Sequence, residues 1–118
     1  MLPKFYLDRY QEFGQVVGQL QQLVSTPSLN PADFQAGCQQ MQEIFQCQIA
    51  SLTGEELADE TVSLWQSSQT EIHRQLKLLE TDWLFWQAAR QPATAQKRQQ
   101  AIAQRLAAIA CYIGRITA

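Results

Sequence analysis

The chain has 118 residues, of which 46% are hydrophobic, and this combination suits one domain with one core rather than a disordered chain. The formal net charge of −2 gives no general attraction to nucleic acid or to an anionic membrane. No apolar run approaches the roughly 20 residues that span a bilayer, and the N-terminus lacks a signal-peptide core. We therefore expect a single cytoplasmic domain over residues 1–118, with neither a membrane nor a nucleic-acid partner.

The N-terminal part of the chain predicts two amphipathic helices. The first follows Pro3 and continues to about Ser25, and the second begins at Asn30, an N-cap residue that precedes Pro31. The connection between them is short, so the two helices are expected to be antiparallel neighbours. Their apolar residues recur at steps of three and four: Tyr6, Tyr10, Phe13, Val17, Leu20 and Val24 in the first, and Phe34, Cys38, Met41, Phe45 and Leu52 in the second, which Ile44 and Ile49 widen.

A third and longer helix is predicted to end near Gln91. Its start has two readings: Thr53, which could form a capping box with Glu56, or Asp59. Pro92 is expected to stop this helix. Its length would be roughly 45–55 Å, against roughly 30 Å for each of the first two. Its apolar stripe comprises Val62, Trp65, Ile72, Leu76, Leu79, Trp83 and Trp86, with Gln69 at the one polar position.

A fourth helix follows, and its apolar residues again step by four and three. Four amphipathic helices with short turns predict an all-α fold: an antiparallel four-helix bundle, up-down-up-down, with a long third helix. The sequence shows no strand pattern, repeat or linker. The stripe of the last helix comprises Ile102, Leu106, Ile109, Ile113 and Ile116.

The turn from Trp83 to Trp86 is apolar on nearly every side, because Leu84 and Phe85 lie between the two tryptophans. Such a turn needs two contact surfaces. Either it lies inside the bundle and packs against a neighbouring helix, or one face meets a second molecule.

Basic residues dominate the C-terminal part of the chain, which has no acids from Arg90 onward. Ion pairs with acids of the third helix are one explanation, and a basic stripe for an acidic partner is the other. Asp82 directly precedes the apolar turn, and if buried it would need a partner such as Arg98 or Arg105.

Reactive constellations are missing from the sequence. His73 is the single histidine, which excludes histidine-based metal sites, and we expect it on the surface. Cys38, Cys47 and Cys111 have no metal-type spacing and are expected to be free thiols. With no phosphate loop or dinucleotide fingerprint either, we expect no metal, no cofactor and no enzyme activity.

The segment from Gln69 to Arg98 resembles the PatD family, the cyanobacterial heterocyst-frequency-control proteins. The resemblance covers about a quarter of the chain, and Cys111-Tyr112 fits it less specifically. It implies a non-catalytic regulator of heterocyst frequency that acts through the cell-division protein FtsZ. The matching residues are Gln69-Thr70-Glu71, Gln75-Leu76-Lys77-Leu78-Leu79, Asp82, Phe85 and Gln87-Ala88-Ala89-Arg90-Gln91-Pro92-Ala93-Thr94-Ala95-Gln96.

The apolar turn and the basic residues that follow it lead us to expect the main interaction surface, for FtsZ or for a homodimer, on the third and fourth helices around Trp83 to Arg98. An alternative function is the binding of a small ligand in a Trp-lined pocket. The candidate interaction residues are Asp82, Trp83, Phe85, Trp86, Arg90, Lys97 and Arg98.

Overall fold

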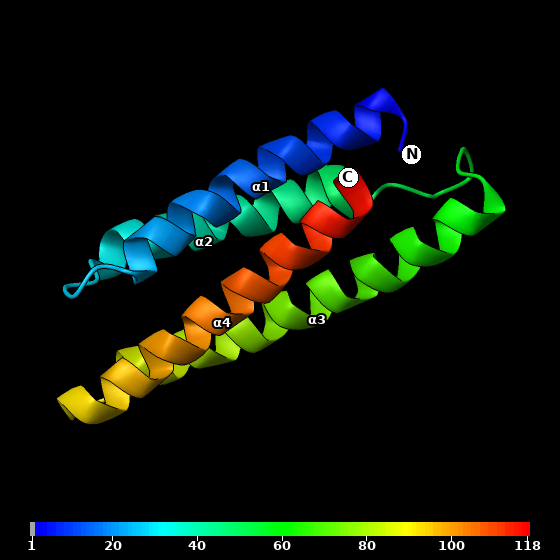
Figure 1. Cartoon of the computed structure of the whole chain (residues 1–118). Coiled ribbons are helices and arrows are strands. Elements are labelled where there is room, and N and C mark those ends of the chain that lie inside the picture. Colours follow the sequence, from blue (N-terminus) through cyan, green and yellow to red (C-terminus); the bar gives the residue numbers. More distant parts are fainter. Residues whose placement is uncertain (1) are drawn as a thin grey trace.

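A computed structural model describes residues 2–118 and confirms the predicted all-α fold. Four helices run antiparallel in up-down-up-down order, and both termini lie at one end of a bundle about 50 Å long and 20 Å across (Figure 1). The helices are α1 (Lys4–Val24), α2 (Pro31–Ile44), α3 (Asp59–Ala88) and α4 (Pro92–Thr117). No strand occurs within residues 2–118.

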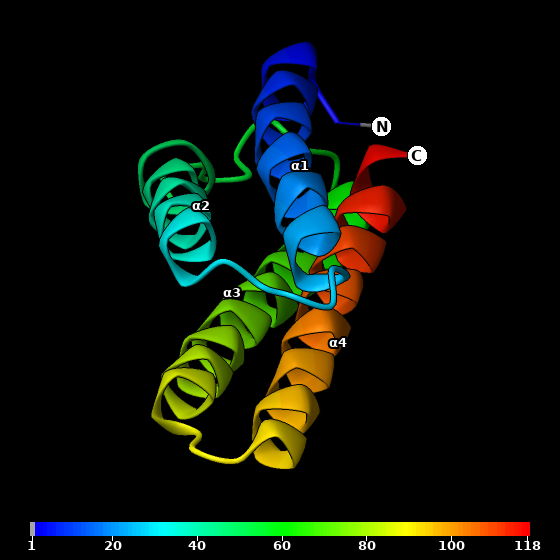
Figure 2. The ribbon, with the colours of Figure 1, turned by 90° about the vertical axis from the view of Figure 1, so that its left-hand side faces the viewer.

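The bundle is made of two helix hairpins. α3 packs against α4 along much of its length, α4 packs against α1, and α1 packs against α2. The fourth side is more open, because α2 stands apart from α3 (Figure 2). Large side chains reach across this gap: the rings of Phe34 and Trp83 have centroids 4.6 Å apart.

The helix starts follow local rules in two cases. The side chain of Asn30 accepts hydrogen bonds from the backbone N–H groups of Ala32 and Asp33, and Pro31 is the first residue of α2. Pro92 is likewise the first residue of α4. The prediction that Pro92 stops the third helix near Gln91 was wrong by three residues, because Pro is favoured in the first turn of a helix, where its missing N–H is not needed.

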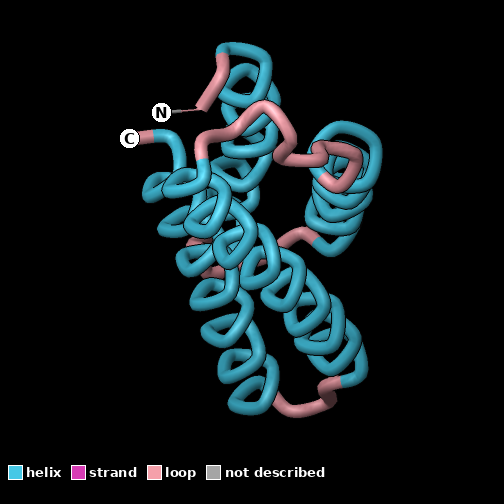
Figure 3. The backbone as a smooth tube through the Cα atoms, turned by 90° about the vertical axis from the view of Figure 1, so that its right-hand side faces the viewer, coloured by secondary structure: helices cyan, strands magenta, loops and turns pink. Residues whose placement is uncertain are grey.

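Of the two starts that the sequence left open for the third helix, Asp59 is confirmed, and the capping box of Thr53 and Glu56 does not form. α3 begins at Asp59, and the segment 50–58 crosses the end of the bundle as a loop (Figure 3). Glu56 instead accepts a hydrogen bond from the hydroxyl of Tyr6 at 2.7 Å, which fixes the loop to α1. Gly54, at φ +81°, donates its backbone N–H to the same hydroxyl at 2.9 Å.

The second helix changes form before it ends. The α-helical part, α2, ends at Ile44, and a π-helical turn, η1 (Phe45–Ile49), follows it directly. A π turn adds a residue to the helical repeat. Phe45, Ile49 and Leu52 all remain buried in the core.

The stripe predicted for the third helix is only part of its buried surface. Trp65, Ile72, Leu76, Leu79 and Trp83 are buried as predicted, whereas Val62 and Trp86 are half-buried. Ser68, Gln75 and Asp82 are buried as well, at steps of seven along the same helix. This spacing keeps all three on one side of α3, the side on which Asp82 meets α4.

Candidate functional site

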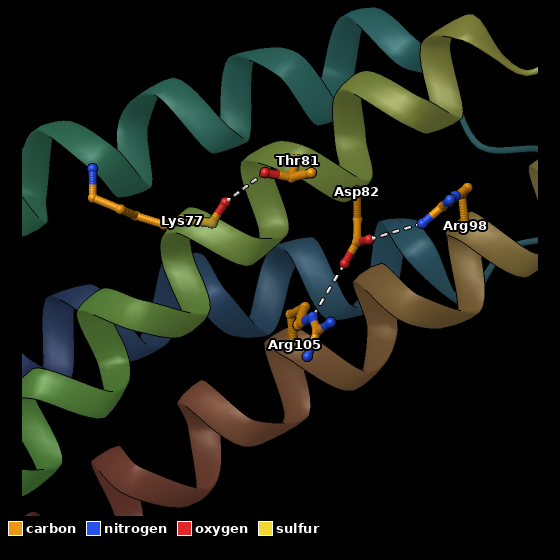
Figure 4. Close-up of polar contacts among 5 residues, drawn as sticks. All are labelled: Lys77, Thr81, Asp82, Arg98 and Arg105. Atoms are coloured by element: carbon orange, nitrogen blue, oxygen red, sulfur yellow. Dashed lines mark hydrogen bonds and ion pairs between the residues drawn. The ribbon is translucent and has the colours of Figure 1, made fainter.

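Asp82 binds two arginines of α4. Its carboxylate lies 3.1 Å from Nε of Arg105 and 3.4 Å from a terminal nitrogen of Arg98, and its side chain is buried (Figure 4). The two arginines are one heptad apart and therefore face α3 together. The sequence named them as alternative partners, and the structure contains both pairs. Asp82 therefore connects α3 to α4 inside the bundle, and its buried carboxylate is not part of an exposed interaction surface.

Trp83 and Trp86 form a stacked pair. Their ring centroids are 5.0 Å apart and their planes differ by 7°. Trp83 is buried, and its indole N–H donates to the side-chain oxygen of Gln35 on α2 at 2.6 Å. Trp83 is therefore part of the core that joins α2 to α3, and nothing in the sequence pointed to Gln35 as its partner.

The other two residues of the apolar turn face solvent. Leu84 is 65% exposed and Phe85 is 49% exposed, although both are large apolar side chains. The guanidinium carbon of Arg98 lies 4.5 Å from the centre of the Phe85 ring, so this arginine contacts both Asp82 and Phe85. The expectation that the turn packs in the core describes Trp83 and Trp86, and the expectation of a second surface describes Leu84 and Phe85. Leu84 is the surface residue that the sequence analysis did not select.

Arg90 and Lys97 are two further basic residues that follow Phe85 in the chain. Both are exposed, and neither forms an ion pair within residues 2–118. Arg90 lies in the loop between α3 and α4, and Lys97 immediately precedes Arg98. We call Phe85, Arg90, Lys97 and Arg98 the basic edge. Within this set Arg98 contacts Phe85, and Arg90 and Lys97 belong to it by their positions in the α3–α4 loop and at the start of α4.

A cavity of about 740 Å³ lies beside Trp86, between the α1–α2 connection and the start of α4. The side-chain amide of Gln99 donates to the backbone oxygens of Val24 (2.7 Å) and Thr26 (2.9 Å) and so joins the two walls. The indole nitrogen of Trp86 is buried and has no hydrogen-bond partner among the described residues. The lining contains no charged residue. Its hydroxyl and amide side chains are Ser25, Thr26, Ser28, Gln96, Gln99 and Gln100.

A second hollow, of about 810 Å³, follows the open side of the bundle between α2 and α3. Cys38, Trp83 and Leu84 supply its apolar surface, and burial raises the pKa of the Cys38 thiol to about 12. The charged residues of the lining are Glu43 and Glu80, and four glutamines and Thr81 complete it. We call this hollow the acidic groove.

The remaining chemical groups are dispersed. Cys47 and Cys111 are exposed, Cys38 is half-buried, and all three are free thiols, as expected. His73 is exposed, and its ring lies 5.6 Å from that of Phe45. Residues 2–118 contain no group of three metal-binding side chains in position to hold an ion.

Comparisons with protein-family models, with curated proteins and with solved structures gave no match. Within residues 2–118, no helix is both long and apolar enough to cross a membrane.

Proposed function

We propose that the chain is a non-catalytic cytoplasmic regulator that binds FtsZ through the basic edge of α3 and α4. The resemblance of Gln69–Arg98 to the PatD family supplies the partner and the link to heterocyst frequency. The observation that supports the surface is the half-exposed Phe85 ring in contact with Arg98, in a part of the chain that also carries the exposed Arg90 and Lys97. Aromatic residues and arginine are enriched where proteins meet, and an acidic segment would complement the charge.

Co-sedimentation with FtsZ polymerised in GTP tests the proposal. Phe85→Ala and the double variant Arg90→Glu/Lys97→Glu should both reduce the amount of this chain in the pellet. Leu64→Ala is the matched control, because Leu64 is also exposed (47%) on α3 but lies near the opposite end of that helix. Trp83→Ala is unsuitable as a binding variant, since Trp83 belongs to the core.

Three results are informative. Loss of pelleting in the edge variants alone supports the partner and the surface together. Equal pelleting of all variants would support FtsZ as the partner but reject the basic edge as the binding surface. If the parent chain stays in the supernatant, direct binding to the filament is rejected. Circular dichroism must show that each variant is folded.

The cavity beside Trp86 favours a second candidate function, the binding of a small ligand. Trp86 lines this cavity together with hydroxyl and amide side chains, so a small ligand bound there would contact the indole ring. Titration with a linear tetrapyrrole or with ATP, followed by tryptophan fluorescence, tests this function. A saturable change that is lost in Trp86→Phe would support it, and an unchanged spectrum with both probes would reject it for these two classes.

A further inference from the structure

Asp82 and Phe85 of α3 contact the same residue of α4, Arg98. Phe85 follows Asp82 by three positions, so the two side chains lie on one face of the helix, about one turn apart. A terminal nitrogen of Arg98 donates to Oδ1 of Asp82 at 3.4 Å, and the guanidinium carbon lies 4.5 Å from the centre of the Phe85 ring. One guanidinium group therefore connects a buried carboxylate to a half-exposed ring.

The carboxylate of Asp82 is itself held in place. Its second oxygen, Oδ2, accepts a hydrogen bond from Nε of Arg105 at 3.1 Å (Figure 4). Because each oxygen binds a different arginine, the carboxylate cannot turn toward one of them without losing the other. Without Asp82, little would keep Arg98 on the ring, since a cation–π contact at an exposed site is weak and an arginine side chain has many rotamers.

The three charged groups leave one positive charge in excess, because one carboxylate faces two guanidinium groups. Arg98 is the more exposed of the two arginines, at 40% against 32% for Arg105. Its hydrogen bond to Asp82 uses one of the five N–H groups that a guanidinium carries. Arg98 thus retains charge and donors for a carboxylate of a partner while its place beside Phe85 is fixed.

We infer that Asp82 is a positioning residue of the basic edge: it acts through Arg98, which it holds against Phe85 in the conformation that binds a partner carboxylate. The inference rests on the proposed function for the surface and for FtsZ as the partner. The physical gain is preorganisation, because a side chain that is ordered beforehand loses less conformational freedom on binding. Arg105 anchors Asp82 and has no contact with the Phe85 ring of this kind.

The positioning is tested first on this chain alone, by NMR spectroscopy of the Arg98 side chain. Protons held over an aromatic face resonate upfield, so the Arg98 signals should be shifted upfield, and Phe85→Leu should remove the shift. Asp82→Ala should also remove most of it, although the ring is still present. Arg105→Gln is the matched control. It breaks the other ion pair of Asp82, leaves the contact with Arg98 intact, and should keep the shift.

Co-sedimentation with FtsZ filaments then tests the effect on binding. Asp82→Ala should weaken binding about two- to tenfold, the change expected when one more long side chain must be ordered on association. Arg105→Gln should bind like the parent. Asp82→Asn keeps the size of the side chain and one acceptor oxygen, so it should lie between the parent and Asp82→Ala in both measurements. It replaces Asp82→Ala if circular dichroism shows that the alanine variant is unfolded.

An Arg98 shift that stays unchanged in the folded Asp82 variants overturns the inference. So does an equal loss of binding in Arg105→Gln, because Asp82 would then act only through the stability of the α3–α4 pair. A parent chain that does not pellet with FtsZ rejects the proposed function instead. In that case the NMR comparison still decides whether Asp82 positions Arg98.

Discussion

The indole N–H of Trp65 donates a hydrogen bond to the hydroxyl oxygen of Tyr10 at 2.9 Å, and both residues are buried. The Tyr10 hydroxyl in turn donates to the side chain of Gln69, whose amide donates to the backbone oxygen of Ile49 at 3.1 Å. This chain of hydrogen bonds connects α1, α3 and η1 inside the bundle. It accounts for Gln69, the polar position in the apolar stripe of α3.

Tyr10→Phe should lower the free energy of unfolding by about 1–3 kcal/mol, because it leaves the buried indole N–H of Trp65 without an acceptor. Urea unfolding followed by circular dichroism measures the change. Tyr112→Phe on α4 is the control, since Tyr112 is only half-buried, and it should change stability by less than about 0.5 kcal/mol. Equal effects of the two variants would contradict the role assigned to Tyr10.

Alkaline pH should destabilise the parent chain through the same tyrosine. Burial raises the pKa of Tyr10 above its ordinary value of 10.0. The neutral phenol is therefore favoured in the folded state, and its contribution is complete below about pH 10 and is lost as the pH rises toward the folded-state pKa. The free energy of unfolding, measured from about pH 8 to about pH 11, should fall less steeply in Tyr10→Phe than in the parent. Parallel curves would contradict this prediction.

Asp82→Asn should destabilise the bundle by about 1–3 kcal/mol, because it removes the charge that two arginines of α4 share. The arginine side chains are 40% and 32% exposed, so water offsets part of the loss. Glu71→Gln is the control: it breaks the exposed pair with Arg74 on α3 and should cost less than about 0.5 kcal/mol. Chemical denaturation compares the two variants, and equal losses would show that the two pairs of Asp82 contribute no more than one exposed ion pair.

Thiol reagents should distinguish the three cysteines. Cys47 and Cys111 are exposed and should react quickly with a disulfide reagent at neutral pH. Cys38 should react slowly, because burial raises the pKa of its thiol to about 12 and little thiolate is present. Mass spectrometry of partly labelled protein identifies the sites. Rapid labelling of Cys38 in the folded chain would contradict the half-buried position and the raised pKa of its thiol.

Gly54→Ala should destabilise the chain by at least about 1 kcal/mol, since a side chain is disfavoured at φ +81°. The added Cβ would also lie 2.7 Å from Cζ3 of Trp65. Gly18→Ala is the matched control. It adds a Cβ in α1 with no atom within 4 Å and should stabilise the helix by about 0.5–1 kcal/mol. Opposite signs are thus expected in thermal unfolding, and a stabilising Gly54→Ala would contradict the assigned backbone conformation.

The regular parts of the fold were predictable because their signals are local. The steps of three and four in α4 correspond to its buried residues, and the cap at Asn30 lies where the sequence placed it. The end of α2 was less predictable, since Phe45 and Ile49 fit an α-helical stripe as well as a π turn. The start of α3 could not be decided from the sequence. The hydrogen bond from Tyr6 that holds Glu56 in the loop spans 50 residues and leaves no local pattern.

The candidate site was predictable only in part for a related reason. Asp82 could be paired with Arg98 or Arg105 in advance, because burial of an acid requires a partner. The sequence could not decide which residues of the apolar turn face outward. That depends on the distance between α2 and α3, which leaves Leu84 exposed and brings Gln35 to Trp83. Apolar periodicity shows which face of a single helix is buried, but it does not show how far apart two helices lie.

α3 carries tryptophan near both of its ends, with Trp65 beside the 50–58 loop and the stacked pair near the α3–α4 connection. Trp83 follows Trp65 by 18 positions, which corresponds to about 27 Å along the helix. A variant with Trp65 as its only tryptophan and a variant with Trp83 as its only tryptophan would therefore fluoresce from opposite ends of α3. In the first, a spectral change would report release of the loop from α1, and in the second, events at the basic edge and the acidic groove. The molecule thus contains its own pair of optical probes, one for each end.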